Sequence, residues 1–328
     1  MIEALTKTSA RIVPFADEHL DGAARLLAER HRAHRLVEPG LDPRYEEPDA
    51  AREELGALVR ADGASGVAGM VDGEIAGFVV GTPRDASWGP NMWVEPAGHA
   101  AVGVELVRDL YAAAAERWVA DGLTMHYAMV PASDHALVDA WFRLGFGHQQ
   151  VYAIRETPSA EERSEAPPGL TVRLARRDDL DALARLDVAL PAHQALSPVF
   201  SRRPLPAVED ARTEYEADFD DPRFTTFVVE RDGDVIGSAI ACAIEMSSDH
   251  KSLALPPGAG FLGFASVLPE ARGCGAGRLL GEAVLGWARD TEREWVVTDW
   301  RMTNLLSSRA WPRLGFRPTF HRLHRAIA

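Results

Sequence analysis

A short segment in the last quarter of the sequence combines a strand, a proline, three glycines and two arginines in a pattern that could bind phosphate. Residues Phe261–Val267 read as an apolar strand, and strand pairing should stop at Pro269, which has no amide proton to donate. Shortly after it come Arg272, Gly273, Cys274, Gly275, Ala276, Gly277 and Arg278. Glycines let the backbone approach an anion, the start of a helix presents free amides, and arginines add charged donors. This chemistry suits a pyrophosphate.

The segment after this turn is predicted to be a helix that packs on a sheet. Its apolar residues fall on one helical face, and they are Leu279, Leu280, Ala283, Val284 and Trp287. A second helix is expected to open at Asn304 and to end in Leu314-Gly315-Phe316. Each feature also has a purely structural explanation. Glycines are common in turns, Asn304 could simply cap its helix, and the two arginines could be solvated surface charges.

These segments resemble the two acetyl-CoA signatures of the GNAT superfamily of N-acetyltransferases. The family pattern is a strand, Val-x-Pro, Arg-Gly-x-Gly-x-Gly/Ala and a Leu-rich helix, followed later by a helix that opens with Asn and ends in Leu-Gly-Phe. The resemblance implies that the turn Arg272–Arg278 holds the pyrophosphate of acetyl-CoA. It also implies that the backbone of Ala265, Ser266 and Val267 binds the pantetheine arm, and that Asn304 lies along this arm near the thiol.

A rival interpretation comes from the spacing Gly275-x-Gly277-x-x-x-Gly281 with Asp299 after a later strand, which imitates a dinucleotide-binding fingerprint. That fingerprint places its first glycine directly after the strand, whereas residues 268–271 intervene here. No further strand–helix–strand units follow Asp299. A nicotinamide enzyme is therefore only a remote alternative.

The resemblance implies direct transfer, in which an amine attacks the thioester while a strand amide near Val267 polarises the carbonyl. Many family members place a tyrosine seven residues after the Asn to protonate the departing thiolate, but that position is Trp311 here. Ser308 and Asp299 are the two candidate catalytic residues. Ser308 could relay a proton or simply bond the helix backbone, and Asp299 could act as a base through water or pair with Arg301 or another arginine.

Three further residues receive other interpretations. His193 and its predicted repeat partner His34 fall in the helical region that walls the acceptor pocket in the family, where a structural histidine is the more common outcome. Cys274 is interpreted as a small loop residue because no histidine and carboxylate pair is evident near it. Metal-binding spacings such as CxxC or HExxH do not occur, so no metal site is predicted.

The same motifs occur twice in the same order. The paired positions are Gly73 and Gly233 in Asp-Gly hairpins, Pro96 and Pro269, and Gly145 and Gly315 in Arg-Leu-Gly-Phe, at offsets of 160, 173 and 170. This regularity predicts an internal repeat, with about a dozen extra residues in the second copy near residues 247–260. The polar, proline-rich segment 156–168 is interpreted as a linker between a first domain, residues 1–155, and a second domain, residues 169–328.

The first copy is expected to have lost the cofactor site. When Pro96 is aligned with Pro269, His99 replaces the arginine of the motif, and Ala100 and Val102 replace two of its glycines. Their side chains would crowd the path of the phosphates. We therefore expect a degenerate first domain that supports the second or lines its acceptor pocket.

Composition limits the compartment and the partners. The chain has 328 residues with a formal net charge of −14, which argues against a nucleic-acid partner and could steer a cationic amine or serve solubility alone. Residues Met1–Lys7 lack the features of a signal peptide, and no apolar run reaches the roughly 20 residues of a membrane helix. The two cysteines imply no disulfide framework. A cytoplasmic protein that does not bind membranes is expected.

Together these observations predict two tandem α/β domains of the GNAT type, each with a mixed, mostly antiparallel, twisted sheet flanked by helices. The expected function is acetyl-CoA-dependent transfer of an acetyl group to the amine of a small molecule. The alternative is a non-catalytic CoA-binding regulator or scaffold, because the tyrosine is missing and the first domain is degenerate. The oligomeric state stays open.

Overall fold

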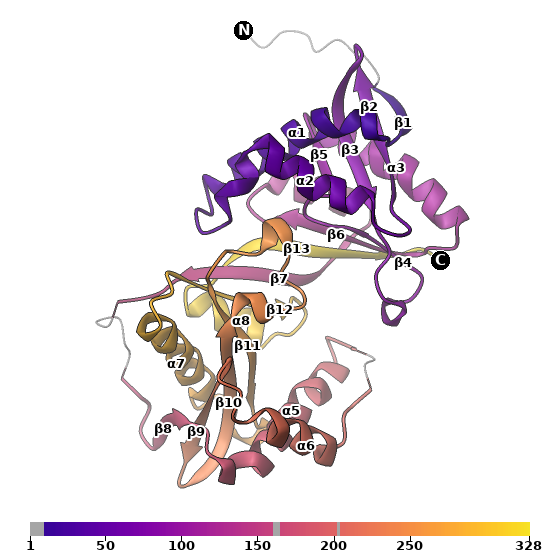
Figure 1. The fold of residues 1–328 in the computed structure, drawn as a ribbon. Helices are drawn as coiled ribbons and strands as arrows, with labels where there is room; N and C mark the ends of the chain where they lie inside the picture. Colours follow the sequence, from indigo (N-terminus) through magenta and orange to yellow (C-terminus); the bar gives the residue numbers. More distant parts are fainter. Residues whose placement is uncertain (1–9, 160–164, 202–203) are drawn as a thin grey trace. The chain divides into compact units, whose positions relative to one another are not determined.

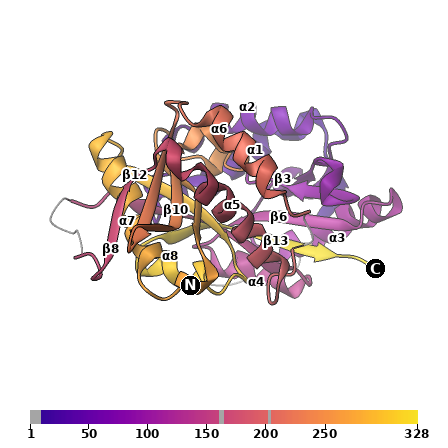
Figure 2. The same ribbon diagram turned by 90° about the horizontal axis from the view of Figure 1, so that it is seen from below.

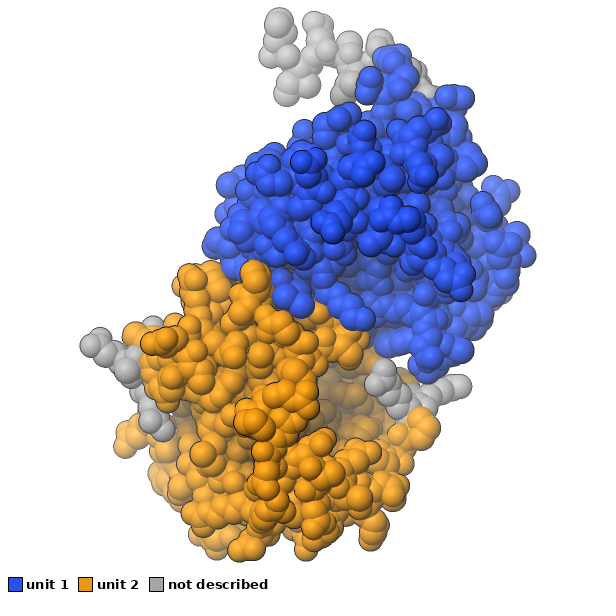
Figure 3. Space-filling model, viewed as in Figure 1, with its two compact units in different colours: residues 1–150, 251–255, 318–328 blue, residues 151–250, 256–317 orange. Residues whose placement is uncertain are grey.

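The computed structural model describes residues 10–159, 165–201 and 204–328 (Figure 1). Contacts divide the chain into two compact units (Figure 3). Unit 1 consists of Met1–Gln150, Lys251–Leu255 and Pro318–Ala328, and unit 2 of Val151–His250 and Pro256–Arg317. Both combine helices with mostly antiparallel strands, which confirms the predicted fold class. Among the described residues, no helix is long and apolar enough to cross a bilayer.

Unit 1 contains two groups of strands. An antiparallel sheet in the order β1-β2-β3-β5 is formed by Arg11–Pro14, Ser65–Val71, Glu74–Gly81 and His99–Ala101. In the other group, β4 (Asn91–Val94) runs parallel to β6 (Met125–Pro131), and β6 pairs antiparallel with β13 (Arg317–Ala326). The long helix α3 (Val104–Ala120) approaches the first sheet closely. A Cβ atom on Gly77 would lie 3.0 Å from Cδ1 of Leu110 on this helix.

Three more helices complete unit 1, namely α1 (Leu20–Arg35), α2 (Pro48–Val59) and α4 (His135–Arg143). The buried core joins residues of β3, β4 and β6 to aromatic side chains of α3 and α4. Among them, Trp118 and Trp141 are almost fully buried. Unit 1 therefore has a hydrophobic core of its own.

The strands of unit 2 follow the order β7-β12-β11-β10-β9-β8. Their bounds are Gly147–Glu156 for β7, Leu170–Leu174 for β8, Phe224–Arg231 for β9, Asp234–Ala243 for β10, Gly260–Val267 for β11 and Trp295–Arg301 for β12. Neighbours among β8, β9, β10 and β11 are antiparallel, whereas β11 and β12 are parallel. This arrangement places the end of β11 and its following turn near the centre of the sheet.

Helices cover both faces of the sheet of unit 2 (Figures 1 and 2). Helix α7 (Ala276–Asp290) packs on one face of β9, β10 and β11, and its apolar stripe belongs to the main core of this unit. Helix α5 (Leu180–Ala195) packs on the other face of β10 and β11, and α6 (Val208–Asp218) packs against α5. The short helix α8 (Ser307–Arg313) follows β12.

The two predicted hairpins are confirmed by their backbone angles. Asp72 and Gly73 have φ values of 52° and 87°, and Asp232 and Gly233 have values of 55° and 91°. Positive φ at both central residues is the mark of a type I′ turn, which matches the twist of the flanking strands. The β2–β3 and β9–β10 hairpins therefore provide equivalent reference points in the two halves of the chain.

The last strand of each half ends in the unit that is formed mainly by the other half. The end of the second half, residues 320–326, pairs residue by residue with β6 of unit 1 from Phe320↔Pro131 to Ala326↔Met125. The end of the first half, residues 151–156 of β7, belongs to unit 2 beside β12. Lys251–Leu255, within the extra residues of the second half, also belongs to unit 1. Each compact unit is thus built from both halves, and the predicted boundaries at residues 155 and 169 stay a prediction about the repeats.

Candidate functional site

The glycine-rich turn joins β11 to α7 in unit 2. Strand pairing ends where the amide of Leu268 donates to the carbonyl of Ile236, and residues Pro269–Ala271 form a single helical turn. Gly273 and Gly275 then adopt left-handed φ values of 84° and 96°. Side chains with a Cβ rarely adopt these angles, so glycines are required here by the backbone itself.

The turn leaves the start of α7 open to a ligand. Gly275 is the N-cap of α7, and no side chain caps the helix there. The first amides of a helix have no partner within it, and they carry the positive end of the helix dipole. A Cβ on Gly273 or Gly277 would meet nothing within 4 Å, whereas one on Gly275 would lie 2.8 Å from Cγ of Pro167. The turn therefore forms an open cradle, with free space at Gly273 and Gly277 and close contact with Pro167 at Gly275.

The edge of β11 next to this cradle is only partly paired. On one side, Ala265, Ser266 and Val267 pair with β10, but the parallel pairing with β12 covers only Gly260–Leu262. Beyond Leu262 the ladder between β11 and β12 ends, although both strands continue. A parting of two parallel strands exposes peptide groups that can bind an extended ligand. The three residues predicted to hold the pantetheine arm lie on this parted segment.

The two arginines of the turn have different roles. Nη1 of Arg278 donates to Glu282 at 2.9 Å, and Nη2 donates to the carbonyl of Glu165 at 3.0 Å. Arg272 instead reaches across the parted edge, with its Nε 3.4 Å from the carbonyl oxygen of Val267. Its Nη1 lies 3.4 Å from Nδ1 of His193 on α5. Arg272 is thus the arginine that faces the proposed pantetheine path.

Asn304 is almost completely buried and lies beside the same cluster. Its Oδ1 accepts from the amide of Leu306 at 3.2 Å, and it lies 3.3 Å from Nε2 of His193. The carbonyl of Asn304 accepts from the amide of Ser308 at 2.9 Å. Helix α8 begins at Ser307 with Leu306 as its N-cap, so the prediction that the helix opens at Asn304 is wrong, and Asn304 is not its N-cap. Asn304 instead bonds the turn before α8 and contacts the histidine next to Arg272.

The structure gives the remaining predicted residues definite places. The thiol of Cys274 donates to the carbonyl of Ala271 within the turn, and Ala276 is buried at the start of α7. Ser308 is half-buried in the first turn of α8. Asp299 is half-buried on β12. Its neighbour Trp300 belongs to the core that contains the apolar residues of α7. Because successive side chains of a strand point to opposite faces, Asp299 faces the other side of the sheet. The catalytic roles of Ser308 and Asp299 stay predictions.

Trp311, which replaces the expected tyrosine, belongs to the hydrophobic core. It is 7% exposed and packs with the side chains of α7 and with Phe316. A Cβ on Gly281 of α7 would lie 3.3 Å from its ring. An indole in this position is a packing residue, and it has no acidic proton for a thiolate.

Residues 10–159, the described part of the first half, lack the glycine-rich turn, and the predicted alignment of Pro96 with Pro269 is wrong. Gly77 and Gly237 each lie four residues after the glycine of their hairpin, and they pair with Ala101 and Val267, respectively. Ala101 is therefore the counterpart of Val267. From Val267, eight residues, 268–275, lead to α7, whereas from Ala101 only two, 102–103, lead to α3.

This register also corrects the interpretation of His99, Ala100 and Val102. His99 and Ala100 pair with Val79 and Phe78 inside β5, so they do not replace residues of the phosphate loop. Val102 follows the strand and is 76% exposed. The first half cannot cradle a pyrophosphate because the loop is missing, and crowding by side chains plays no part.

A buried arginine occupies the corresponding strand end in unit 1. The guanidinium of Arg30, on α1, donates to the carbonyl oxygens of Pro96 and His99. Burial lowers the pKa of Arg30 to about 10, with Asp134 acting in the opposite direction. Burial also lowers the pKa of His99 to about 3, and Arg30 lowers it further, so this ring is neutral. Its Nε2 donates to the carbonyl of Met129 at 2.9 Å. Side chains of the protein thus bond the carbonyl groups at this strand end, although Nε of Arg30 and Nδ1 of His99 have no hydrogen-bond partner.

Sequence reasoning placed His193 only in the general region of the acceptor pocket, and it did not point to Arg30 or to the contact partners of either residue. The contacts of His193 join positions 79 and 111 residues apart, and those of Arg30 join positions 66 and 69 residues apart. Neither residue belongs to a motif with fixed spacing. The predicted repeat partner of His193 has a different environment, because His34 is buried against the edge of Phe320 with ring centroids 4.8 Å apart.

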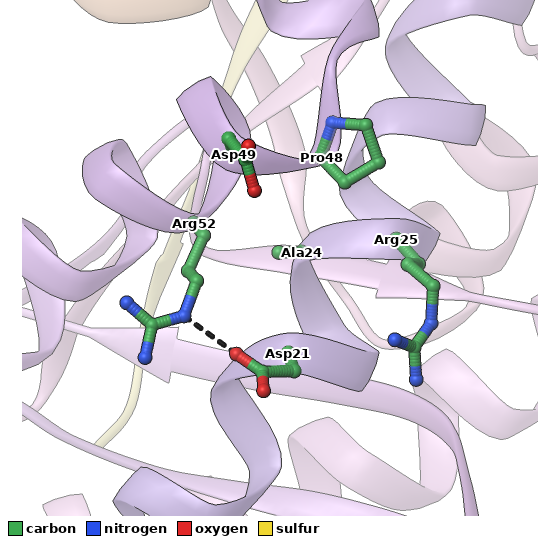
Figure 4. Close-up of a pocket in the computed structure, with 6 residues that line it drawn as sticks. All are labelled: Asp21, Ala24, Arg25, Pro48, Asp49 and Arg52. Carbon is green, nitrogen blue, oxygen red and sulfur yellow. Dashed lines mark hydrogen bonds and ion pairs between the residues drawn. The ribbon is translucent and has the colours of Figure 1, made fainter.

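Unit 1 also has an open surface pocket of about 600 Å³ between α1 and α2 (Figure 4). Its lining residues are Asp21, Ala24, Arg25, Pro48, Asp49 and Arg52. Nε of Arg52 donates to Asp21 at 2.5 Å, and both side chains are exposed. Exposed ion pairs of this kind contribute little. None of the predicted site residues lines this pocket.

One family model matches the part of the chain that contains this site. Residues 192–316 match the model of the acetyltransferase (GNAT) family. A crystal structure of a GCN5-related N-acetyltransferase from Sphaerobacter thermophilus aligns with 96% of this chain and 95% of its own, at 18% identity and a TM-score of 0.58. No curated protein sequence matches this chain significantly.

Two more solved structures align over almost the whole chain. A glucosamine N-acetyltransferase region of a fungal multi-domain β-N-acetylglucosaminidase covers 98% of this chain and 38% of that one, at 16% identity and a TM-score of 0.51. A tandem GNAT protein from the clavulanic acid biosynthesis pathway covers 97% of this chain and 98% of its own, at 17% identity and a TM-score of 0.49. The alignments with the Sphaerobacter thermophilus protein and with the fungal region show a shared fold, and at such low identities they show nothing more.

Proposed function

Because residues 192–316 belong to the acetyltransferase (GNAT) family and the whole chain has the fold of a two-unit GNAT protein, we propose that it is an acetyl-CoA-dependent N-acetyltransferase. It would transfer the acetyl group directly from the thioester sulfur to the amine nitrogen of a small molecule. The observation that supports this most strongly is the cradle of Gly273 and Gly275 next to the parted edge of β11. Among the described residues, this combination occurs in the second half alone.

The proposed binding mode assigns a part of the cosubstrate to each part of the site. The amides at the start of α7 and the turn Arg272–Arg278 would hold the pyrophosphate, which is the chemistry for which uncapped helix starts are suited. The peptide groups of Ala265, Ser266 and Val267 on the β12 side would bond the pantetheine arm. Asn304 would contact the arm near its thiol end.

The chemistry requires an unprotonated amine, a polarised carbonyl and a proton for the departing sulfur. A backbone amide near Val267 is the candidate group for polarising the carbonyl. Ser308 and Asp299 are retained as candidates for proton transfer, and Trp311 is not one of them because it is a core residue. The net charge of −14 favours a cationic amine over a polyanionic partner. The cytoplasmic location stays a prediction.

Calorimetry followed by a turnover assay tests the proposal. The full-length chain is first titrated with acetyl-CoA, and then a panel of small primary amines is added while free thiol and acetylated amine are measured. We expect binding, thiol release and N-acetylation with at least one amine. Binding without release across the panel would favour a CoA-responsive regulator, and no binding of any acyl-CoA would refute the proposal.

A further inference from the structure

The side chain of His193 lies between two predicted cofactor residues. It is half-buried near the end of α5, and its ring nitrogens are 3.4 Å from Nη1 of Arg272 and 3.3 Å from Oδ1 of Asn304. The same guanidinium lies 3.4 Å from the carbonyl of Val267 at the parted strand edge. One imidazole therefore connects the turn that would hold phosphate with the residues that would lie along the pantetheine.

One tautomer of the ring makes both contacts at once. A guanidinium can only donate, so Nδ1 must accept from Arg272 and cannot carry a proton. Nε2 then carries the proton of the neutral ring and donates to Oδ1 of Asn304. In this tautomer the lone pair of Nδ1 is bound to Arg272.

The contact with Arg272 is weak enough to be exchanged. Distances of 3.3–3.4 Å are at or beyond the long end of the usual range for N–H hydrogen bonds. Bonds from a guanidinium to a phosphate are shorter and stronger. A pyrophosphate in the cradle would draw Arg272 away from Nδ1 and from Val267, and it would leave the bond between His193 and Asn304 in place.

We infer that His193 is the catalytic base that deprotonates the acceptor amine, and that Arg272 keeps it occupied until the cosubstrate is bound. This inference rests on the proposed function. Nδ1 takes one proton from the ammonium group of the acceptor, and the freed lone pair forms the new bond to the carbonyl carbon. The carbon–sulfur bond breaks with its electron pair going to sulfur. The thiolate gains the second proton that the nitrogen loses, and His193 returns its own proton to solvent.

The binding order follows from this arrangement. Acetyl-CoA should bind first, because the base becomes available only when Arg272 has moved. An amine that arrives at the empty protein would meet an imidazole without a free lone pair. The contact between Arg272 and His193 would also limit deprotonation of the amine to protein that has already bound acetyl-CoA.

The variant His193→Gln tests the base directly. Its amide nitrogen can still donate to Asn304, but it cannot accept a proton from an ammonium group. We expect kcat/KM for the amine to fall at least 100-fold while the Kd of acetyl-CoA stays within about twofold, as a general base contributes about 10²–10⁴-fold. His135→Gln, the same change at an exposed histidine of unit 1, is the control and should have the activity of the wild type.

A second measurement does not depend on turnover. The ¹⁵N resonance of His193 Nδ1, assigned by its absence in His193→Gln, should move when CoA is added to the wild-type protein. The same displacement should already be present in Arg272→Gln without CoA. A resonance unaffected by either change would overturn the gating by Arg272.

The outcomes separate the inference from the proposed function. If the wild type acetylates an amine and His193→Gln does so within twofold, His193 is not the base. If His193→Gln loses acetyl-CoA affinity and turnover by the same factor, the residue binds the cosubstrate and the base assignment is overturned. If the wild type binds acetyl-CoA but acetylates nothing, the proposed function fails, and the role of His193 fails with it.

Discussion

Arg30 donates a hydrogen bond to the carbonyl oxygen of His99 at the point where the first half of the chain lacks a phosphate-binding loop. The corresponding strand end in the second half, Val267, is followed by an open turn of glycines. The two halves therefore use the same position of the fold in opposite ways. One fills it with a protein cation, and the other leaves it available for an anion.

One molecule of CoA should bind per chain. Calorimetry of the wild type should give a stoichiometry of about one, because the turn is present in unit 2 and absent from the described residues of unit 1. Gly275→Val should abolish binding, since valine would be strained at a φ of 96° and its Cβ would lie 2.8 Å from Pro167. Val102→Gly should leave binding unchanged, as Val102 is exposed and precedes no loop.

The control for Gly275→Val is Gly73→Val in the hairpin of unit 1. Gly73 has a φ of 87° and open space around it, so this change imposes similar backbone strain, of roughly 1–2 kcal/mol, outside the proposed site. It should lower stability and keep the Kd of CoA. Equal affinity of Gly275→Val and the wild type would refute the placement of the pyrophosphate.

Replacing Arg30 should destabilise unit 1 without creating a second CoA site. In Arg30→Met the carbonyls of Pro96 and His99 lose their buried donor, which should lower the free energy of unfolding by about 2–4 kcal/mol. Urea denaturation measures the change. Arg52→Met, which breaks an exposed ion pair, should cost less than about 1 kcal/mol. A second molecule of CoA bound to Arg30→Met would show that the arginine, and not the missing loop, closes the site.

Local patterns predicted much of the fold correctly. The Asp-Gly turns, the strand that ends at Val267 and the helix after the glycines all follow from backbone preferences of a few neighbouring residues. The missing loop was not predicted, because Val-Glu-Pro before His99 looks like Val-Leu-Pro before the real loop. The pairing of Ala101 with Gly77 shows that Pro96 lies between β4 and β5, before the strand end that corresponds to Val267.

Contacts between residues far apart in the sequence could not be predicted. The final strands β7 and β13 have similar alternation and the same preceding Gly-Phe, so nothing local states which sheet each one joins. The contact of Arg272 with His193 depends on how the end of α5 lies over β11, which no spacing encodes. The glycine-rich turn could be predicted from its motif, whereas the contacts of its residues with distant helices could not.

Unit 1 should lose stability as the pH falls below neutrality. Burial lowers the pKa of His34, His99 and His321 to about 3, far below the value of about 6.5 expected in the unfolded chain. Between these values the unfolded chain binds more protons than the folded one, so stability decreases as the pH falls through 6.5. Each such histidine contributes up to about 1.4 kcal/mol per pH unit in this window.

Hydrogen exchange of the peptide 125–131 in β6 reports the opening of unit 1, and its protection should fall from pH 6.5 to pH 4.5 beyond the intrinsic change in exchange rate. In His34→Gln the slope of stability against pH should decrease by the equivalent of about one bound proton. His135→Gln, at an exposed position, should keep the slope of the wild type. The same slope in His34→Gln and the wild type would mean that His34 is not held neutral.

Because the end of β13 belongs to unit 1 and the end of β7 to unit 2, the two halves of the chain should stay associated after the chain is cut between them. When a protease site is introduced at residues 160–164 and cleaved, the two fragments should elute together, because residues 320–326 complete unit 1 and residues 151–156 complete unit 2. Expressed alone, residues 1–159 lack the antiparallel partner of β6, and an unpaired strand edge of this kind promotes aggregation. Mixing the separately expressed halves under refolding conditions should restore CoA binding. Two fragments that separate after cleavage and each keep a cooperative unfolding transition would show that the strands are not exchanged.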